Sequence, residues 1–599
     1  MSETAEHIVE QSHPAAGRTL TGAEIIVQVL ADEGVETVFG YSGGAILPTY
    51  DAIFRFNESQ NAAMPLVVPA NEQGAGFMAA GYARATGKVG AAIVTSGPGA
   101  TNTVTPVRDC MADSVPMVLI TGQVARAAIG TDAFQEAPVA NIMSPVAKHV
   151  FMVTDPEQLE ATVRTAFEIA RSGRPGPVVI DVPKDVQTQQ NVFRGSGVLP
   201  VPGYRQRMQA LRDNKLSSDK CRAFFELFEA SQRPLIYAGG GVINAGASQA
   251  LRDFAHRFEL PVVTTLMGIG ALDTSDPLCL HMLGMHGTAY ANYAVEDCDL
   301  LIAIGARFDD RVAGVPSQFA PSARAIAHLD ADASEINKVK AVDWHHVGLF
   351  SESITQLTLY GQKHNVGTTP SAWHEHLTEL RQTYPMNYDQ ESDLIQPPAV
   401  MQAINRQTNG NAVVATGVGQ HQMWSAQYCQ FREPRLWLTS GSMGTMGFGL
   451  PAAIGAAFAR PDRQVIDIDG DASIRMNIGE LETATTYDLP VKVLVINNNG
   501  DGMVKQWQKL FFMGRLSASD KSLHKKDFIK AAEADGFKFA QRLSDPAALD
   551  DTIEKFLAFD GPAFLEVEVD PDAGVYPMVG PGKTYSEMIT GDYIATRGE

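Results

Sequence analysis

The chain has 599 residues, a net charge of −21, 45% hydrophobic and 19% charged residues, which is typical of a globular soluble protein of three or four domains. The negative charge argues against nucleic-acid backbones and anionic membranes as partners, and no apolar run reaches the roughly 18–20 residues of a membrane span. The five cysteines show no metal-ligand spacing, and the N-terminus resembles neither a secretory signal nor an Arg-rich transit peptide. We therefore expect a cytoplasmic protein with reduced thiols.

The first part of the chain alternates short apolar strands with helix-like stretches, after a tail over residues 1–18 that we expect to be disordered. Strands that alternate with helices predict a parallel α/β sheet, here over residues 19–192. Each strand ends in small or polar residues, so the loops at these ends should form the working edge of this domain. The predicted strands are Thr37–Gly40, Leu66–Pro69, Ala91–Thr95, Met117–Thr121 and Pro177–Val182.

Two further α/β domains follow, over residues 221–360 and 398–575. Residues 193–220 are interpreted as a linker, residues 361–397 as a second linker plus a lead-in helix, and residues 576–599 as a C-terminal tail. The predicted strands of these two domains are Pro234–Tyr237, Pro261–Thr265, Leu300–Ile304, Ala325–Leu329, Ala412–Thr416, Arg435–Thr439, Val465–Asp469, Val491–Ile496 and Ala563–Val569. The first and third domains share a strand-rich plan, but the sequence shows no obvious internal repeat.

Two polar turns follow strands of the third domain, Gly470-Asp471-Ala472 and Asn497-Asn498. A helix-like stretch separates the two strands, so a right-handed crossover should make them parallel and bring Asp471 and Asn498 side by side. A carboxylate and an amide oxygen suit Mg²⁺ that takes its remaining ligands from a diphosphate. Either dipeptide alone is more simply a turn. The pair, with 24 residues between Ala472 and Asn497, resembles the thiamine-diphosphate fingerprint.

Glu72 stands at a strand end where a helix over Gly76–Ala85 is expected to begin. The simple interpretation is a carboxylate in a helix's first turn, favourable by about 0.3–1 kcal/mol. Thiamine chemistry offers another, because it needs a carboxylate hydrogen-bonded to N1′ of the aminopyrimidine. That contact stabilises the imino tautomer, whose 4′-nitrogen takes the C2 proton, and a buried carboxylate with a raised pKa suits this exchange. The segment Pro69–Ala75 resembles the glutamate motif of the pyrimidine-binding domain in that superfamily.

Two glycine-rich turns of the third domain, residues 417–422 and 444–451, offer backbone N–H groups to a diphosphate. Met446, in the second turn, can be an ordinary core residue. In the superfamily, a bulky apolar side chain at this position lies under the cofactor and brings the 4′-nitrogen to C2.

Four other segments narrow the resemblance: Ile129–Glu136 (IGTDAFQE), Ser172–Pro177 (SGRPGP), Gly305–Val312 (GARFDDRV) and Gly502–Trp507 (GMVKQW). From about residue 20 to 590 the chain resembles the catalytic large subunits of the acetohydroxyacid synthase (acetolactate synthase) family. The resemblance implies three parallel-sheet α/β domains: pyrimidine-binding, central FAD-binding and diphosphate-binding. It implies a transferase that decarboxylates pyruvate on thiamine diphosphate and transfers the hydroxyethyl carbanion to a second 2-oxoacid. The acceptor is pyruvate, giving 2-acetolactate, or 2-oxobutyrate, giving 2-aceto-2-hydroxybutyrate, at the first step towards valine, leucine and isoleucine.

The resemblance assigns five catalytic residues to the first domain. Glu72 would activate thiamine diphosphate. Gly43 and Gln135 would lie near the reacting carbon, and Phe134 and Lys184 at the substrate channel.

The resemblance assigns two more catalytic residues to the other domains. Arg311 would meet the carboxylate of the second 2-oxoacid, since a guanidinium matches it in a bidentate way. Trp507 would shape the pocket that prefers the extra methyl group of 2-oxobutyrate, a discrimination of about 1–3 kcal/mol. The alternatives are a surface ion pair of Arg311 with Asp309 or Asp310, and a core aromatic for Trp507.

Three cofactors follow from the resemblance: thiamine diphosphate, Mg²⁺ and FAD without a net redox role. Mg²⁺ would be bound by Asp471, Asn498 and the backbone carbonyl of Gly500. The residues implied for thiamine diphosphate are Glu72, Gly417, Val418, Gly419, Gln420, His421, Gly444, Met446, Gly470, Asp471, Ala472, Asn498 and Met503. Those implied for FAD are Arg174, Gly239, Gly240, Gly241, Thr264, Leu266, Leu283, Gly284, Met285, His286, Gly305, Arg307, Asp309, Arg311 and Asp330. From the residues alone, three successive glycines are a weak nucleotide signal, because GxGxxG is absent.

Three positions depart from the family's usual pattern. Ser42 stands where a Pro is common before the paired glycines, and Asn71 where a basic residue or His precedes the catalytic Glu. Ala125 replaces a Pro that is common where the family's herbicides bind, so we expect weak inhibition by sulfonylureas. An inhibition curve as potent as that of a Pro-containing enzyme would contradict this expectation.

Because Glu72 and Asp471 belong to different domains, the cofactor must lie between two domains. In the superfamily these come from neighbouring chains, so we expect a homodimer or homotetramer, with a possible small regulatory subunit. Residues Gln508–Asp520 and Pro577–Tyr585 are expected to form a lid that excludes water. The alternatives are a pyruvate oxidase that uses FAD for electron transfer, a glyoxylate carboligase, which lacks the Glu, and a catalytically silent paralogue.

Overall fold

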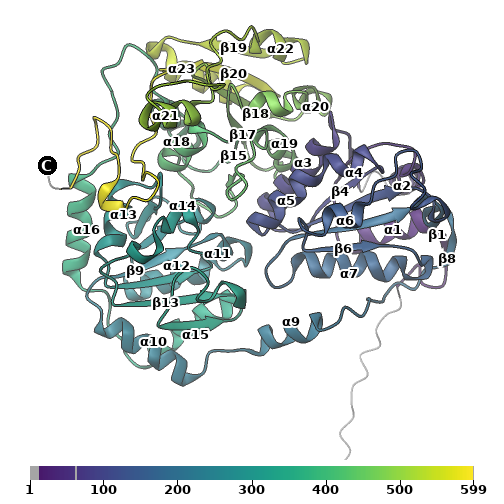
Figure 1. The fold of residues 1–599 in the computed structure, drawn as a ribbon, viewed down its shortest axis with the longest axis horizontal. Coiled ribbons are helices and arrows are strands. Elements are labelled where there is room, and N and C mark those ends of the chain that lie inside the picture. The colour runs from purple at the N-terminus through teal and green to yellow at the C-terminus, as the bar shows by residue number, and fades with distance from the viewer. Residues whose placement is uncertain (1–12, 61–63, 598–599) are drawn as a thin grey trace, which may run out of the picture.

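The computed structural model describes residues 13–60 and 64–597, which form three α/β units (Figure 1). Each unit contains one six-stranded sheet in which all neighbouring strands are parallel. The predicted fold class, three parallel-sheet domains, is therefore confirmed. Within the described ranges, the helices are all too short or too polar to cross a membrane.

The first unit, on the right of Figure 1, has the strand order β3-β2-β4-β5-β7-β6. Its strands are β2 (Val38–Tyr41), β3 (Leu66–Val67), β4 (Gly90–Val94), β5 (Met117–Gln123), β6 (His149–Met152) and β7 (Pro177–Pro183). Its helices are α1 (Gly22–Asp32), α2 (Leu47–Ser59), α3 (Glu72–Thr86), α4 (Pro98–Asn102), α5 (Val104–Asp113), α6 (Val139–Met143), α7 (Leu159–Arg171) and α8 (Lys184–Thr188). A small antiparallel pair, β1 (Thr19–Thr21) and β8 (Gln190–Val192), joins the start of this unit to its end.

The middle unit has the strand order β11-β10-β9-β12-β13-β14. Its strands are β9 (Pro234–Ala238), β10 (Val262–Thr264), β11 (Cys279–Met282), β12 (Leu300–Ile304), β13 (Ala325–Asp330) and β14 (Trp344–Val347). Its helices are α10 (Ser218–Ala230), α11 (Gly240–Asn244), α12 (Ser248–Phe258), α13 (Ala289–Asp297), α14 (Asp310–Ala313), α15 (Phe350–Lys363) and α16 (Ser371–Thr383).

The third unit, at the top of Figure 1, has the strand order β16-β15-β17-β18-β20-β19. Its strands are β15 (Val413–Thr416), β16 (Trp437–Leu438), β17 (Val465–Gly470), β18 (Val491–Asn497), β19 (Phe539–Leu543) and β20 (Ala563–Glu568). Its helices are α17 (Pro397–Thr408), α18 (Gln420–Tyr428), α19 (Gly449–Ala459), α20 (Glu480–Thr486), α21 (Gly502–Phe511), α22 (Phe528–Ala534) and α23 (Leu549–Ala558).

Helices α3 and α19 join the first unit to the third by close packing of small residues. A Cβ on Gly81 would overlap the Ala452 carbonyl, and a Cβ on Gly455 would overlap the Met78 carbonyl. Glycine at these two crossings lets the helix backbones approach closely. As a result, buried apolar side chains of both units belong to one continuous core.

The predicted tail and the first predicted linker contain more structure than expected. Residues 1–12 lie outside the described residues, but the next part of the predicted tail packs on the first unit, where the Gly17 N–H donates to the Phe193 carbonyl. Helix α9 (Tyr204–Asp213) lies in the first predicted linker, whereas α16 lies in the second, where a helix was expected. The C-terminal segment packs on the middle unit through Tyr585 and Met588, so this half of the predicted lid is anchored there. A few apolar residues anchor each of these mostly polar segments. The exact domain boundaries stay predictions.

Candidate active site

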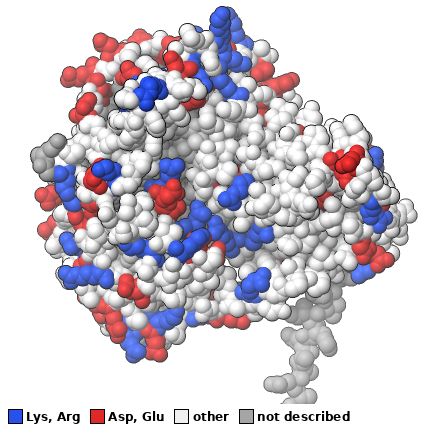
Figure 2. All heavy atoms as spheres, in the orientation of Figure 1, with Lys and Arg blue, Asp and Glu red and all other residues white. Residues whose placement is uncertain are grey.

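A cavity of about 1800 Å³ opens between the three units. Its lining includes several arginines, although the chain as a whole is strongly acidic, and Figure 2 shows basic side chains gathered at the centre of this face. The local charge therefore suits an anionic ligand. The arginines are Arg84, Arg171, Arg174, Arg212, Arg307, Arg311 and Arg435.

Asp471 and Asn498 follow the neighbouring strands β17 and β18 and both line this cavity. The two strands run parallel and in register to Gly470 and Ile496, so they end at the same level. The Asp471 N–H donates to the Ile496 carbonyl at 3.3 Å, which ties the two turns together. The predicted parallel pairing of the two strands and its consequence, two polar turns at one sheet edge, are present in the structure.

The amide of Asn498 is held in one orientation by a chain of side-chain amides. Its Nδ2 donates to Gln420 Oε1 at 2.8 Å, and Gln420 Nε2 donates to Gln506 Oε1 at 2.9 Å. With its nitrogen engaged, Asn498 presents its oxygen as the atom available to a cation.

The donor set at this edge fits a hard cation such as Mg²⁺. Asp471 Oδ1 is buried and has no hydrogen-bond partner among the described residues. Burial also raises the pKa of the Asp471 carboxyl to about 6, and a bound cation would favour its charged form. A carboxylate, the Asn498 amide oxygen and the Gly500 carbonyl are oxygen ligands of the kind Mg²⁺ prefers.

The first glycine-rich turn of the third unit is shaped by the buried side chains beneath it. A Cβ on Gly417 would overlap Asp469 Oδ1, so the turn can adopt this path only with glycine there. His421, in the first turn of α18, lies close by, and burial lowers its pKa to about 3. It is therefore neutral at physiological pH and leaves the N–H groups of the α18 N-terminus as the anion-binding feature.

The second glycine-rich turn presents Met446 to the cavity. Gly444 and Gly447 on either side adopt positive φ angles of 61° and 83°. The turn is fixed from below, because the Gly447 N–H donates to Ser473 Oγ at 3.0 Å and Asn477 Nδ2 donates to the Gly447 carbonyl at 2.8 Å. Ser473 and Asn477, which follow Asp471 in the chain, thus fix the backbone that positions Met446.

The glycines of the middle unit meet where its strand order reverses. Numbered in chain order, its strands run 3-2-1-4-5-6, with the reversal between β9 and β12. Dinucleotides bind at this point in doubly wound sheets. Gly239 follows β9 and Gly305 follows β12, and a Cβ on Gly239 would overlap the Gly305 carbonyl. This topology strengthens a nucleotide signal that was weak in the sequence, and the cradle fits FAD.

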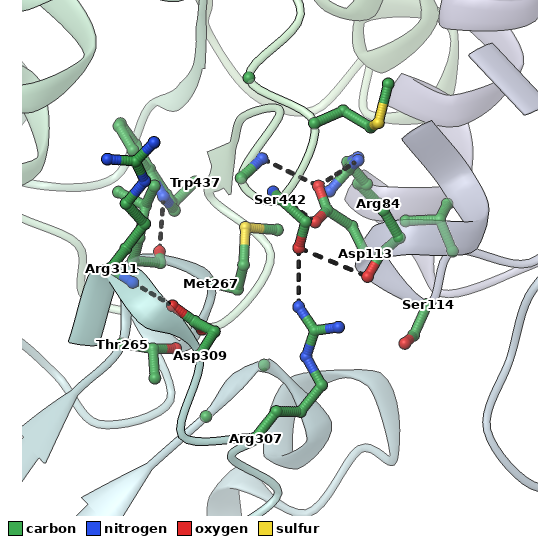
Figure 3. A pocket seen from close by; sticks show the side chains of 18 of the residues that line it. Arg84, Asp113, Ser114, Thr265, Met267, Arg307, Asp309, Arg311, Trp437 and Ser442 are labelled. Atoms are coloured by element: carbon green, nitrogen blue, oxygen red, sulfur yellow. Dashed lines mark hydrogen bonds and ion pairs between the residues drawn. The ribbon is translucent and has the colours of Figure 1, made fainter. Parts of the chain in front are cut away.

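Two arginines bridge the units across the cavity. Arg174, from the first unit, donates from Nη1 to Glu335 Oε1 of the middle unit at 2.8 Å. Arg307, from the middle unit, donates from Nη2 to Ser442 Oγ of the third unit at 2.7 Å, and Figure 3 shows it pointing towards Asp113 and Ser442. Both side chains lie where the sequence predicts an FAD site.

Arg311 and Trp507 both line the cavity. The Arg311 backbone N–H donates to Asp309 Oδ1 at 3.0 Å, whereas its guanidinium lies 3.9 Å from Asp310. An ion pair this long and this exposed leaves the guanidinium available to a carboxylate ligand. Trp507 is half-buried on α21 and packs edge-on against Phe511. Neither residue is a buried core residue.

The five catalytic candidates of the first unit do not line the cavity. They are Gly43, Glu72, Phe134, Gln135 and Lys184. Phe134 is 88% exposed, and Lys184 is exposed at the start of α8. Glu72 is half-buried and is the first residue of α3, where its Oε2 accepts a hydrogen bond from Asn102 Nδ2 at 2.9 Å.

Three of these five candidates surround the loop that follows β4. A Cβ on Gly43 would meet the Thr95 side chain in this loop. A Cβ on Gly99 would lie 3.4 Å from Glu72 Oε1, and one on Gly97 would lie 2.7 Å from the Gln135 carbonyl oxygen. The first unit therefore gathers these three candidates around one loop, away from the lining of the cavity.

Asn71, a departure from the family pattern, has a clear local role. Its side-chain oxygen accepts the Gly74 N–H at 3.0 Å and so caps α3. An N-cap of this kind is typically worth about 1 kcal/mol. The helix begins at Glu72, four residues before the predicted start at Gly76. The predicted start was too late because the sequence-based prediction did not recognise Asn71 as the cap.

The chain matches three family models and many full-length relatives. Residues 20–143, 221–357 and 417–567 match the N-terminal, central and C-terminal domains of thiamine pyrophosphate enzymes, the outer two described as TPP binding. The acetolactate synthase large subunit of Parasynechococcus marenigrum (strain WH8102) is 46% identical over 96% of this chain and 91% of that protein. Acetolactate synthase 1, chloroplastic, of Nicotiana tabacum is 44% identical over 98% and 87%. The mitochondrial acetolactate synthase catalytic subunit of Saccharomyces cerevisiae is 44% identical over 96% and 84%.

The chain belongs to the acetolactate synthase family. The resemblance inferred from its motifs is confirmed.

Most residues that the acetolactate synthase resemblance assigns to cofactors line the one cavity. Besides those described above, they are Gly240, Gly241, Leu266, Leu283, Met285, His286, Asp330, Val418, Gly419, Ala472 and Met503. Four do not line it: Glu72, Thr264, Gly284 and Gly417. Thr264 ends β10 and is buried there, and its neighbour Thr265 faces the cavity instead.

Several residues that line the cavity were not predicted from the sequence. Met267, Ser442, Arg435 and Trp437 are among them, and Figure 3 shows Ser442 between Arg307 and Asp113, with Met267 beside it. They lie in connecting loops or at strand ends and form no motif by themselves. Only the fold brings them together.

Proposed function

We propose that this chain is the catalytic large subunit of an acetolactate synthase. It would decarboxylate pyruvate and transfer the remaining two-carbon unit to pyruvate or 2-oxobutyrate, the first step of branched-chain amino-acid biosynthesis. The observation that carries the proposal is the pairing of Asp471 and Asn498 at adjacent strand ends in a cavity that also holds Arg311 and Trp507. Near full-length similarity to acetolactate synthases supports it.

The proposed cofactor of the third unit is thiamine diphosphate with Mg²⁺. When bound, thiamine diphosphate would supply a nucleophilic thiazolium carbon and an electron sink for the decarboxylation of pyruvate. Asp471, Asn498 and Gly500 would bind Mg²⁺, and the turn at Gly417 would bind the diphosphate. Met446 would support the cofactor from below.

Glu72 would hold a proton at N1′ of the aminopyrimidine. Arg311 would bind the carboxylate of the acceptor 2-oxoacid through its guanidinium. Trp507 would set the size of the acceptor pocket, which favours 2-oxobutyrate by about 1–3 kcal/mol at most.

FAD is the proposed ligand of the middle unit, between Gly239 and Gly305. The strand order of this unit supports it, and Arg174 and Arg307 supply positive charge near a pyrophosphate. FAD would have a structural rather than a redox role.

A homodimer or homotetramer is the proposed assembly, because each chain's cavity lacks Glu72 and its neighbours. The surface around these residues fits this proposal, since Leu47 and Phe134 are 53% and 88% exposed. Exposed apolar side chains of this size beside catalytic candidates suit a face that a second copy covers. A small regulatory subunit is a further proposed partner, since relatives are named as large or catalytic subunits. We propose a cytoplasmic location.

The proposed function is tested by pyruvate consumption with thiamine diphosphate, Mg²⁺ and FAD, scored for acetolactate and for flavin absorbance. Acetolactate with oxidised flavin is the expected result, and competition by 2-oxobutyrate measures the acceptor preference.

Other outcomes would point to the competing functions. Flavin reduction with acetate or acetyl phosphate would indicate a pyruvate oxidase. No turnover, even with a regulatory subunit added, would indicate a catalytically silent paralogue. The similarity to acetolactate synthases favours neither, and Glu72 argues against a glyoxylate carboligase.

A further inference from the structure

The loop between β3 and α3, which leads to Glu72, is held by the third unit. The Val68 N–H donates to the Tyr487 hydroxyl at 2.7 Å, and the Ala70 N–H donates to Glu480 Oε2 at 3.1 Å. Glu480 is the first residue of α20, and Tyr487 is its C-terminal cap. Figure 1 shows α20 close to the start of α3. The backbone just before Glu72 therefore takes its position from another domain.

Glu480 is a buried carboxylate whose hydrogen bonds are incomplete. The residue is 0% exposed, and its Oε2 also accepts a hydrogen bond from Thr483 Oγ1 at 2.7 Å. Its Oε1 has no partner among the described residues. A buried, half-satisfied carboxylate is costly for folding, and an apolar residue of similar size would cost less. Stability alone therefore does not account for a Glu at this position.

The first turn of α3 is shaped around this carboxylate. A Cβ on Gly74 would overlap Glu480 Oε1, so the helix leaves room for it two residues after Glu72. The Gly74 N–H donates to Asn71 at 3.0 Å, which closes the cap of the helix. Ala70, Asn71 and Glu72 are consecutive, so a displacement at Ala70 turns the start of α3 and the Glu72 side chain with it.

We propose that Glu480 is a positioning residue for Glu72. By fixing the Ala70 N–H, it sets the direction in which the Glu72 carboxylate is presented to the aminopyrimidine of thiamine diphosphate. The inference rests on the function proposed above. It is a third-domain residue acting on a first-domain acid, without contact to substrate or cofactor.

The first test uses the enzyme without cofactors and measures amide hydrogen exchange by mass spectrometry. Glu480→Ala should raise the exchange rate of the peptide that contains Ala70 by about tenfold or more, because its N–H loses an acceptor. Glu480→Gln keeps an acceptor oxygen and the side-chain shape, so it should restore slow exchange. Glu482→Ala, at an exposed position of the same helix, is the matched control and should change nothing.

The second test uses the enzyme loaded with thiamine diphosphate and Mg²⁺. Glu480→Ala should slow C2-proton exchange of the cofactor by roughly 10–100-fold, since a displacement of about 1 Å can cost this much. It should also weaken the circular dichroism band of the imino tautomer. Cofactor affinity should stay within about threefold of the wild type, because Asp471 and Asn498 are untouched.

These measurements separate a positioning role from a structural one. Normal C2 exchange in Glu480→Ala would overturn the inference, as would equal losses of cofactor affinity and exchange rate. If that variant does not fold, Tyr487→Phe removes only the acceptor of the Val68 N–H. It should slow C2 exchange to a smaller degree, and no change there would also overturn the inference. A wild-type protein that exchanges the C2 proton but forms no acetolactate would refute the proposed product and not the role of Glu480.

Discussion

The first and third units share one topology and contribute different chemistry. Numbered in chain order within each unit, the strands of both run 2-1-3-4-6-5, whereas those of the middle unit run 3-2-1-4-5-6. The sequences of the two outer units show no obvious internal repeat. The sequence indicates only that both units are strand-rich, and their common topology becomes visible in the order of the strands.

The two helices that join these units occupy equivalent places. The offset in residue number that relates Gly81 to Gly455 also relates Met78 to Ala452, and these four residues make the two reciprocal close contacts. The same offset relates Glu72 to Met446. One scaffold used twice thus presents a carboxylate at one position and an apolar side chain at its counterpart. Similar folds can therefore supply complementary parts of one site.

The largest effects should come from removing one group from each outer unit. Glu72→Gln should lower kcat by about 10²–10⁴-fold and leave binding of thiamine diphosphate intact, because only proton transfer is affected. Asp471→Asn should instead abolish Mg²⁺-dependent binding, because the site loses its carboxylate. Acetolactate formation and fluorescence titration with the cofactor measure the two effects. Glu482→Gln serves as a control, and an Asp471→Asn variant that binds the cofactor normally would refute the division of roles.

How far the sequence predicts the fold depends on where a strand lies in its sheet. Besides the small pair β1 and β8, four strands of the six-stranded sheets were missed, β6, β11, β14 and β19, and each is an edge strand. An edge strand pairs with only one other strand and is less completely buried, so its sequence can contain polar residues. In β19, Gln541 and Arg542 are exposed, and these polar residues interrupt the apolar run that would predict a strand. Central strands such as β18 are buried along most of their length and were found.

The residues of the site also fall into two groups: those that a sequence motif reveals and those that only the fold reveals. Asp471 and Asn498 were found because a fixed spacing in a strand–helix–strand unit determines their neighbourhood. Arg435 and Ser442 were missed because only the packing of the units brings them to the cavity. Glu480 belongs to this second class: in the sequence it is an ordinary residue of a helix.

The stability of the contact between the first and third units should depend on pH because of Glu480. Burial raises the pKa of this carboxyl from 4.5 to about 7, so the folded chain binds the proton more tightly than the unfolded chain. The resulting stabilisation is present below about pH 4.5 and is lost as the pH rises through about 7. The free energy of unfolding of the wild type relative to Glu480→Gln should therefore fall by up to about 3 kcal/mol across this range.

Urea unfolding of the wild type and Glu480→Gln at about pH 5 and about pH 8 measures this change. Glu482→Gln should show no such dependence, since its side chain is exposed. A difference between wild type and Glu480→Gln that is the same at both pH values would mean that Glu480 is ionised throughout.

The reciprocal helix contacts can be tested with a single methyl group on either side. Gly81→Ala and Gly455→Ala should each destabilise the protein by about 1–3 kcal/mol, because the added carbon forces α3 and α19 apart. Gly367→Ala is the matched control, since a Cβ there meets nothing within 4 Å. Thermal unfolding of the three variants gives the comparison. Unequal losses for Gly81 and Gly455 would show that the two crossings are not equivalent.

The smallest effect is expected when two inactive variants are mixed, and this experiment tests directly whether the first and third units of different chains form one site. Glu72→Gln damages the first unit and Asp471→Asn the third, so if each site takes one unit from each chain, a mixed dimer has one doubly damaged site and one intact site. Random exchange of subunits makes half of the dimers mixed, so activity should recover to about a quarter of the wild type. The mixture is assayed for acetolactate after subunit exchange, with each variant alone as the control. If a site were instead built within one chain, every site in the mixture would carry one of the two defects and no activity would return. A quarter of the activity would therefore establish that the two outer units, alike in topology, meet across a subunit boundary to form one site.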